Sequence, residues 1–233
     1  MVGGSNPSGQ ATIYSNMFLL NKKPIIVNFP WKHLLIEDCL PIEIADELDE
    51  NWNDTWKWGG INSGYRGRIY SQPNIDNKLH FEFFLENWNR RDELVEMCDS
   101  YFEDENKNQA DFYHWKYIEY FPKNEDVDKE LIRKWHTDIP DKKYHFLYYL
   151  GKHVEGNGYL EMKNDLSDSP VLSYPFRHNR LLVFQNHEKA FHQFFYANGN
   201  RKTVNLTFKH RDPENDKVKK EFEEMIEVYK KTI

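Results

Sequence analysis

The stretch FHQFFYANGNRKTVNLTF, residues 191–208, largely decides the fold that we predict for this chain. Two runs of aromatic and branched residues flank Asn198-Gly199, a dipeptide typical of two-residue hairpin turns. Such a turn pairs the two strands and places six side chains on one face of the sheet. These six are Tyr196 opposite Arg201, Phe194 opposite Thr203, and His192 opposite Asn205. The other face carries Val204, Leu206 and Phe208, which suit packing against helices.

Similar runs recur from residue 111 onward, separated by turn residues. Together with the two above, they span 112–121, 144–150, 158–162, 180–186, 191–197 and 201–208. Several short strands at regular spacing are typical of an antiparallel sandwich or barrel. We therefore predict a mainly β fold with its core in residues 111–211.

Helical patterns flank this core on both sides. Ile44, Leu48 and Trp52 share one face of a helix predicted over residues 42–52, and a second apolar stripe predicts a helix over 85–102. After the core, Asp212-Pro213 has the capping and first-turn residue types of a helix within 212–233. The chain of 233 residues suits one domain. In it, residues 1–110 support the core, and the helices brace one outer face of the sheet.

Composition argues against several classes of protein. The net charge is -7 and no long basic run is present, so nucleic acid is a poor candidate partner. No stretch approaches the ~18–20 apolar residues of a membrane span, and the first residues lack a secretory pattern. We therefore expect a soluble, cytoplasmic protein. Cys39 and Cys98 are expected to be reduced thiols.

Two histidines and an aspartate give the main chemical signal. In Trp135-His136-Thr137-Asp138, a strand would point His136 and Asp138 the same way. His192 stands 56 residues beyond His136, after a strongly apolar strand. Two imidazoles and one carboxylate on one face of an octahedral metal leave three positions open, the arrangement of non-haem Fe(II) sites.

Arg201 is the predicted anion-binding residue. In the hairpin register it lies four residues along the sheet from the level of His192, roughly 13 Å at ~3.3 Å per residue. A planar guanidinium binds a carboxylate through two parallel hydrogen bonds. A metal-chelated dicarboxylate and an extended Arg201 side chain would together bridge that distance.

Residues 115–208 resemble the 2-oxoglutarate/Fe(II) oxygenase superfamily, and within it the prolyl-hydroxylase-like branch. The family pattern is H-x-D, a distant His, and Arg some nine residues later, which His136, Asp138, His192 and Arg201 match. The run RLLVF at 180–184 resembles the family strand that precedes the second His. This resemblance covers about 40% of the chain. It implies a double-stranded β-helix, a jelly-roll or cupin-like barrel.

The resemblance also implies roles for single residues. Fe(II) would be held at the catalytic centre by His136, Asp138 and His192, and the far carboxylate of 2-oxoglutarate by Arg201. Further residues are expected around the co-substrate, namely Tyr149, Leu160, Thr203 and Asn205. Leu160 ends GNGYL at 156–160, which resembles the family's Gly-Gly-x-Leu turn, with Asn157 in place of the first glycine.

The remaining candidate residues are expected to have other roles. His187 is the alternative distal ligand, but it lies in a predicted loop five residues too early for the hairpin face. His145 and His178 are expected to be surface or packing residues, and Arg180 a structural ion-pair partner. Tyr120 suits either pocket lining or packing. The run NLTFK at 205–209 resembles a nucleic-acid dealkylase branch, but that branch has its arginine where this chain has Thr203.

The resemblance implies a dioxygenase that uses dioxygen and 2-oxoglutarate, hydroxylates its substrate and releases succinate and CO2. Asp138 supplies a carboxylate where halogenating relatives have a small residue, so hydroxylation is favoured. A peptidyl side chain such as proline and a small metabolite both remain open as substrates, and the oligomeric state is not given. The alternative function is a non-catalytic jelly-roll module that binds a metal or ligand.

Overall fold

The computed structural model describes residues 22–52, 67–105, 109–120, 130–152, 158–167, 169–196, 201–212 and 216–232. Its strands and helices follow the chain in this order: β1 (Ile25–Val27), β2 (His33–Glu37), α1 (Ile42–Glu50), β3 (Gly67–Tyr70), α2 (Lys78–Asn89), α3 (Arg91–Phe102), β4 (Ala110–Tyr120), β5 (Glu130–His136), β6 (Lys142–Leu150), β7 (Gly158–Lys163), β8 (Leu172–Pro175), β9 (Arg180–Gln185), β10 (Phe191–Tyr196), β11 (Arg201–His210) and α4 (Asp216–Lys230). The fold is mainly β, as predicted.

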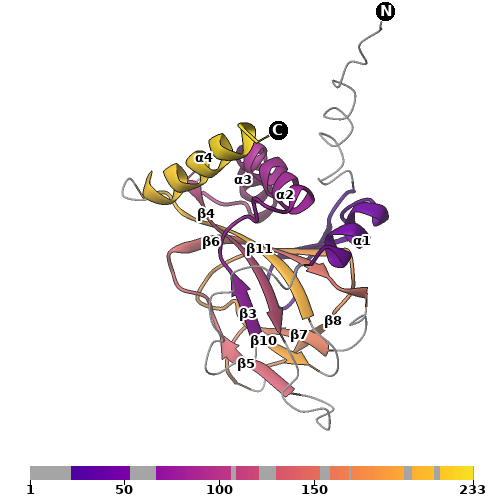
Figure 1. Cartoon of the computed structure of the whole chain (residues 1–233). Helices are drawn as coiled ribbons and strands as arrows, with labels where there is room; N and C mark the ends of the chain where they lie inside the picture. Colours follow the sequence, from indigo (N-terminus) through magenta and orange to yellow (C-terminus); the bar gives the residue numbers. More distant parts are fainter. Residues whose placement is uncertain are drawn as a thin grey trace, which may run out of the picture.

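The strands form two antiparallel sheets that lie against each other (Figure 1). The larger sheet has the order β1-β2-β9-β6-β11-β4-β3, and the smaller has the order β5-β10-β7-β8. An apolar cluster joins them, with Leu147, Leu182 and Phe184 from the larger sheet and Leu160 and Phe194 from the smaller. Burial of these side chains is the main force that holds the two sheets together.

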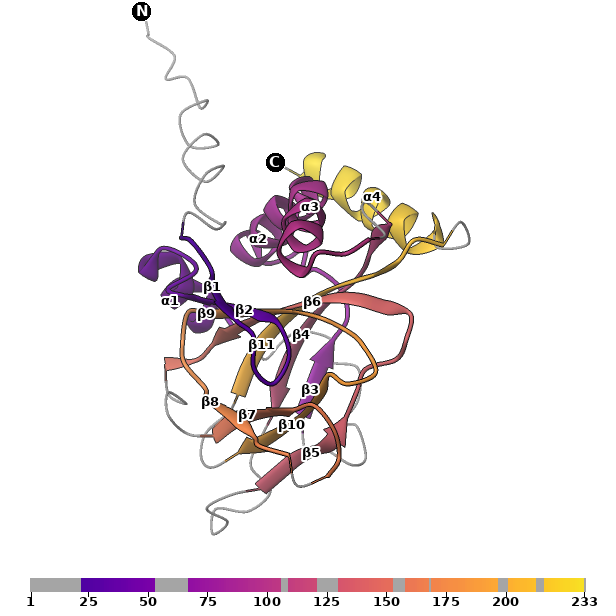
Figure 2. The same cartoon turned by 180° about the vertical axis from the view of Figure 1, so that it is seen from behind.

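The opposite face of the larger sheet packs against helices. Figures 1 and 2 show α2, α3 and α4 grouped together beyond that sheet, away from β5, β7, β8 and β10. The ring of Phe83 on α2 lies 5.3 Å from Trp115 on β4, and Phe84 lies 5.4 Å from Phe222 on α4. Val204 and Leu206 belong to the same buried cluster. These two residues of β11 thus face helices, as the sequence predicted.

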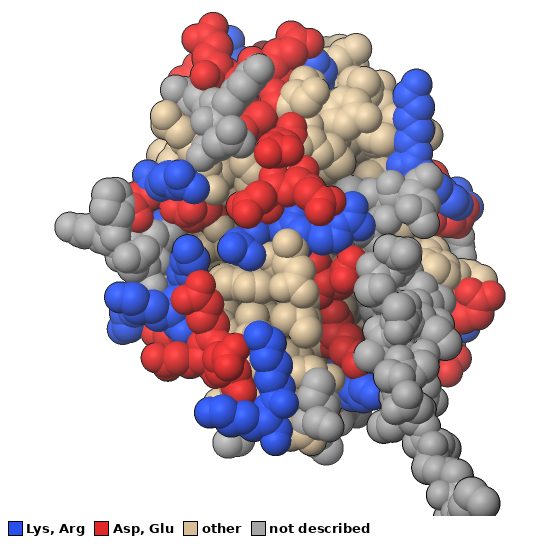
Figure 3. All heavy atoms as spheres, turned by 90° about the horizontal axis from the view of Figure 1, so that it is seen from above, with Lys and Arg blue, Asp and Glu red and all other residues tan. Residues whose placement is uncertain are grey.

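Seen from the helix side, acidic and basic side chains are interspersed over the described surface (Figure 3). In the described part of the chain, no helix combines the length and apolar character needed to cross a membrane. Cys39 and Cys98 are free and buried, as expected.

The predicted helix over 85–102 is wrong in its boundaries. It is two helices, α2 and α3, separated at Arg90, whose backbone leaves the helical conformation at φ -100 and ψ 14. The first helix begins seven residues earlier, because the side chain of Asn77 accepts a hydrogen bond from the His80 N–H and caps it.

The predicted hairpin is also wrong. β10 pairs with β5 and β7, whereas β11 pairs with β4 and β6 in the other sheet. The turn expected at Asn198-Gly199 lies outside the described residues. In the larger sheet, β11 has hydrogen-bonded neighbours on both edges and buries both faces, which a simple hairpin with β10 would not provide. The predicted faces of β11 nevertheless hold, because strand alternation does not depend on the partner.

Buried histidines should make the fold sensitive to acid. Burial lowers the pKa of His80 to about 3, although its Nε2–H donates to the Leu48 carbonyl. The unfolded chain therefore binds one more proton than the folded chain between about pH 6.5 and 3. This contribution to stability is complete above pH 6.5 and declines as pH falls, by about 2 kcal/mol at pH 5. In urea unfolding at pH 7 and pH 5, His80→Gln should lose much of this pH dependence, whereas exposed His210→Gln should keep it.

Candidate functional site

A cavity of about 340 Å³ opens between the two sheets. Its described lining includes four residues predicted for the site: Asp138, His192, Arg201 and Asn205. These come from the segment after β5 and from strands β10 and β11, which belong to different sheets. The volume lies within the range of roughly 300–1,000 Å³ that is common for small-molecule sites.

His136 and His192 face each other across the smaller sheet. They are direct partners in the β5–β10 ladder, and their ring centroids are 4.2 Å apart. The Nδ1–H of His192 donates to the Ala190 carbonyl at 3.0 Å, which leaves a lone pair on Nε2 in the neutral ring. Fixing one ring nitrogen in this way is how proteins orient a metal-binding imidazole.

Asp138 lies beyond the end of β5, whose last residue is His136. Strand alternation, which we used to place it, therefore does not apply. Its Oδ2 lies 3.8 Å from Nε2 of His192 and 3.3 Å from Nε2 of His145, and its Oδ1 accepts from Lys142 Nζ at 2.8 Å. Burial alone would raise the pKa of Asp138, but His145, His192 and Lys142 outweigh it and lower that pKa. The carboxylate is thus ionised at neutral pH.

Within the described residues, no group of three or more His, Cys, Asp or Glu side chains is arranged to hold a metal ion as it stands. The carboxylate of Asp138 is turned toward Lys142 and His145. The donor types still fit a borderline divalent metal, since two imidazoles and one carboxylate lie close together and one imidazole has its tautomer set.

Arg201 is almost fully buried, with 2% of its surface exposed. Its guanidinium carbon lies 4.0 Å from the ring centroid of Phe194, 4.9 Å from Phe176, 5.3 Å from Tyr120 and 5.4 Å from Tyr149. Aromatic faces stabilise a cation without neutralising it. The cage therefore surrounds a charged guanidinium at one end of the cavity.

The other predicted co-substrate residues lie near this cage or on its strand. Thr203 sits opposite Tyr149, and Asn205 lies two residues further along β11. Thr203 Oγ1 and Asn205 Oδ1 are buried without a hydrogen-bond partner among the described residues. Burial raises the pKa of the Tyr149 hydroxyl, with Arg201 opposing, so the hydroxyl stays protonated at neutral pH. Leu160 instead lies in the apolar cluster behind Phe194, its partner in the ladder.

His145 packs against an aromatic ring, which is one of its two expected roles, but it also lines the cavity, which was not expected. It lies at the site, close to Asp138, with its ring stacked on Phe184 at 4.8 Å. His114, Lys116 and Lys142 also line the cavity and were not predicted. Alternation along β6 would have found His145, since it shares the face of Leu147 and Tyr149. His114 and Lys116 on β4 gave no local signal, because their position depends on pairing with β11.

The remaining expectations concern three residues that lie away from the cavity, and Tyr120, which lines it. His187 packs edge-on against Trp31, with ring centroids 6.0 Å apart. Nε2 of His178 hydrogen-bonds to Asp46 at 3.0 Å, which is a structural role. Arg180 forms the predicted ion pair, with its guanidinium donating to both carboxylate oxygens of Glu37. Tyr120 lines the cavity and contacts Arg201.

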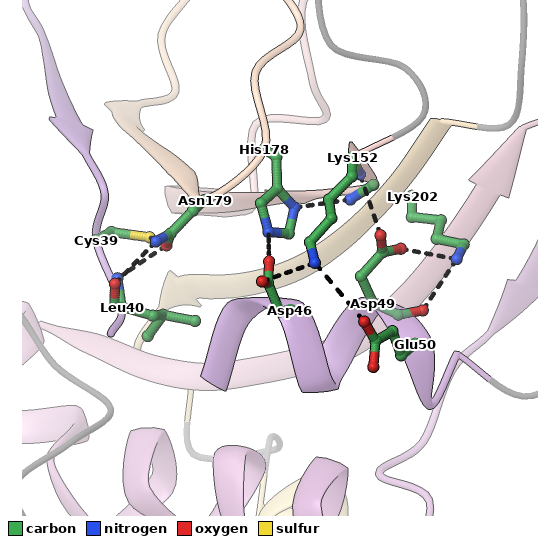
Figure 4. A network of polar contacts seen from close by, with 10 residues as sticks. Cys39, Leu40, Asp46, Asp49, Glu50, Lys152, His178, Asn179 and Lys202 are labelled. Carbon is green, nitrogen blue, oxygen red and sulfur yellow. Dashed lines mark hydrogen bonds and ion pairs between the residues drawn. The ribbon is translucent and has the colours of Figure 1, made fainter. Parts of the chain in front are cut away.

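A polar network ties helix α1 to the sheet beside Arg201. Figure 4 shows Lys152, His178 and Lys202 directed toward the acidic side chains of α1. Asp49 Oδ1 accepts from Lys202 Nζ at 2.7 Å, and Asp49 Oδ2 accepts from the Lys152 backbone N–H at 3.0 Å. Because Lys202 follows Arg201, this contact fixes the start of β11 and thereby the backbone that carries the guanidinium.

Removal of the Asp49 charge should destabilise the fold. Asp49 is 5% exposed and Lys202 has a side-chain exposure of 18%, so Asp49→Asn leaves a half-buried ammonium without its counter-ion. We expect a loss of about 2–3 kcal/mol in urea unfolding. Glu50→Gln, on the exposed side of the same helix, is the matched control and should leave the midpoint unchanged. Equal effects of the two substitutions would contradict this role for Asp49.

Comparison with known proteins gives matches at the level of structure alone. No family model and no curated protein matches the sequence. A prolyl-4-hydroxylase from Pseudomonas putida matches with a TM-score of 0.58 and 14% identity, over 77% of this chain and 93% of that one. A Trichoplax adhaerens prolyl hydroxylase, in complex with a hypoxia inducible factor peptide fragment, matches with a TM-score of 0.52 and 15% identity, over 76% and 83%.

A third match is the solved structure of an enzyme that catalyses a different reaction. It is the non-haem α-ketoglutarate-dependent epimerase SnoN from nogalamycin biosynthesis, with a TM-score of 0.53 and 9% identity, over 77% of this chain and 81% of that one. Identities this low establish the fold and leave the reaction open. The resemblance seen in the sequence is thus confirmed in three dimensions: this chain has the fold of the 2-oxoglutarate/Fe(II) oxygenases, with prolyl hydroxylases among its structural neighbours.

Proposed function

We propose that this protein is an Fe(II)- and 2-oxoglutarate-dependent dioxygenase that hydroxylates its substrate. The observation that carries the proposal is the convergence of His136, His192 and Asp138 beside a cavity that also contains the caged Arg201. These four residues come from separate segments of the chain. Their spacing in the sequence matches the pattern of the 2-oxoglutarate/Fe(II) oxygenase superfamily. The cavity and the fold support the same assignment.

His136, Asp138 and His192 would hold the iron. When bound, Fe(II) with 2-oxoglutarate and dioxygen would supply the oxidising chemistry, with succinate and CO2 as products. Ala190 keeps the Nε2 lone pair of His192 available. Lys142 and His145 hold Asp138 ionised, and its carboxylate would leave them to bind the metal.

Arg201 would hold the far carboxylate of 2-oxoglutarate. Its guanidinium offers paired donors, and the surrounding rings exclude water and strengthen those hydrogen bonds. The protonated Tyr149 hydroxyl would add a donor beside it. Thr203 and Asn205, with buried polar atoms on the same strand face, would contact the rest of the co-substrate.

The substrate would be a peptidyl side chain such as proline, or a small metabolite. The Trichoplax neighbour was solved with a peptide fragment, which supports the first class. The modest cavity volume supports the second. Panels of peptides, amino acids and metabolites, screened for 2-oxoglutarate consumption above the uncoupled rate, would separate the two classes.

The alternative is a non-catalytic jelly-roll module that binds a metal or ligand at this site. The discriminating measurement is succinate release that requires both Fe(II) and 2-oxoglutarate. Enzyme activity predicts succinate in the complete mixture and none when either is omitted. Binding of both without succinate release under any panel member would favour the module.

A further inference from the structure

A series of aromatic rings connects the candidate metal residues with the partly exposed Tyr174. The ring of Phe184 lines the cavity, and its centroid lies 5.5 Å from that of His192. The same Phe184 ring lies 5.4 Å from Trp31. Trp31 in turn lies 5.4 Å from His33, and His33 lies 5.5 Å from Tyr174. Each distance falls in the range of about 4.5–7 Å in which aromatic rings pack directly against each other.

The strand pairing holds the inner part of this series in place. His33 on β2 is the ladder partner of Phe184 on β9, and Trp31 lies just before β2. The indole N–H of Trp31 donates to the Lys163 carbonyl at 3.3 Å, which fixes the ring. Trp31 and His33 are buried, whereas Tyr174 is partly exposed. The rings therefore run through the interior and end at a side chain that solvent can reach.

The hydrogen bond between Tyr174 and His33 has a defined direction. Nδ1 of His33 lies 2.8 Å from the Trp31 carbonyl, which can only accept, so Nδ1 has the hydrogen. Burial lowers the pKa of His33, with the Trp31 carbonyl opposing, so the ring is neutral at pH 7. Its Nε2 then has a lone pair, which accepts the hydroxyl hydrogen of Tyr174 at 2.8 Å. A base is thus aligned with the O–H bond of Tyr174.

This pair has the geometry that one-electron oxidation of a tyrosine requires. Loss of an electron makes a phenol strongly acidic, so its proton has to pass to a nearby base. Nε2 of His33 can accept that proton and return it when the tyrosine is reduced again. Tyr149, by contrast, lies beside the guanidinium of Arg201, which has no site to accept a proton. Trp31, the other readily oxidised ring in the series, lies between the cavity and the pair.

We propose that Trp31, His33 and Tyr174 form a redox relay that removes a one-electron oxidant formed at the metal residues when no substrate is bound. An electron passes from Tyr174 through Trp31 to the oxidant, and the phenolic proton of Tyr174 passes to Nε2 of His33. The oxidant is reduced by one electron, and Tyr174 becomes a neutral radical beside an imidazolium. An external reductant such as ascorbate returns the electron, and His33 returns the proton.

The relay would protect the side chains that line the cavity from oxidation during turnover without substrate. This inference rests on the proposed function, because 2-oxoglutarate and dioxygen supply the oxidant. It adds a role for three residues that the proposed metal and co-substrate sites do not use.

The test mixes the full chain, loaded with Fe(II) and 2-oxoglutarate without oxygen, with dioxygen in the absence of substrate. Samples frozen at increasing times are examined by electron paramagnetic resonance, and succinate is measured in the same samples. We expect a tyrosyl radical, identified by the change in its hyperfine pattern when the protein contains ring-deuterated tyrosine. Tyr174→Phe should remove this signal, and ascorbate should shorten its lifetime in the wild type.

Two further variants test the route and the base. Trp31→Phe keeps a ring but makes it hard to oxidise, and His33→Gln keeps a hydrogen-bond acceptor but removes the base. Both should lose most of the radical signal while still forming succinate, which shows that they fold. Tyr101→Phe is the matched control and should retain the full signal, because Tyr101 is partly buried in the helix cluster on the other face of the larger sheet. A merely structural role for the Tyr174–His33 bond would leave the radical signal unchanged.

The possible results separate this inference from the proposed function. If no succinate forms here or with any member of the substrate panels, the proposed function fails and the relay fails with it. If succinate forms only with a substrate, no oxidant is left to remove, and the relay alone is overturned. Succinate without a tyrosyl radical, or a radical that persists in Tyr174→Phe, also overturns the relay while the proposed function stands.

Discussion

Replacement of His136 with alanine is expected to reduce 2-oxoglutarate-dependent succinate release to background. The imidazole lies directly opposite His192, and both rings are needed to complete a ligand set of two imidazoles and one carboxylate. Loss of a residue that merely orients a ligand typically costs about 10–100-fold in metal affinity or activity. Loss of a ligand itself should exceed ~100-fold, measured as succinate formed with Fe(II) in excess.

The matched control is His187→Ala. His187 was the alternative ligand in the sequence, and it packs against Trp31 instead of lining the cavity with His192. We expect this variant to retain metal binding and turnover. Direct titration with Mn(II), followed by electron paramagnetic resonance, separates lost binding from lost chemistry. Retention of full metal affinity in His136→Ala would remove this residue from the proposed site.

Replacement of Arg201 with methionine should raise the 2-oxoglutarate concentration needed for half-maximal turnover by about 100-fold, or about 2.7 kcal/mol. The guanidinium is surrounded by Phe176, Phe194, Tyr120 and Tyr149, which an apolar side chain of similar length can pack against. The variant should therefore fold. The maximal rate should change far less than the requirement for co-substrate.

Arg201→Lys serves as the graded comparison. Lysine keeps the charge but has a point-like ammonium in place of the planar fork, so its co-substrate requirement should fall between those of wild type and Arg201→Met. Calorimetric titration of 2-oxoglutarate into the Mn(II)-loaded proteins measures the binding affinity without turnover. The affinities should rank wild type, Arg201→Lys and Arg201→Met in that order. An unchanged requirement in Arg201→Met would place the co-substrate carboxylate elsewhere.

The sequence predicted the components of the candidate site more reliably than their strand pairing. Alternation along β11 is a local property, so the side on which Arg201 and Asn205 lie could be read directly. The strands that pair with β11 could not be predicted in this way, because Asn198-Gly199 favours a turn whichever strands the flanking segments pair with. Long-range burial placed β10 and β11 in different sheets. Arg201 nevertheless lies near β10, through the contact of its guanidinium with Phe194 across the cavity.

Three basic residues of the cavity lining, His114, Lys116 and His145, show the limit of reasoning from single segments. His145 could have been assigned to the site from its spacing to Tyr149. His114 and Lys116 could not have been assigned from their own segment. They line the cavity only because β4 pairs with β11 along ten residues of β11. For Asp138 the predicted position was right but the reasoning was not. We expected it near His192 because we placed it on a strand, and that strand ends before Asp138.

The two-sided character of β11 limits how the length of the chain can vary. Its alternate residues serve separate environments, with Val204, Leu206 and Phe208 buried toward the helices and Arg201, Asn205 and Thr207 lining the cavity. Deletion of a single residue within the strand would exchange the two sets for every position beyond it. Insertions and deletions among homologues should therefore be confined to the connections between strands, and directed-evolution libraries should vary residue type, not length, here.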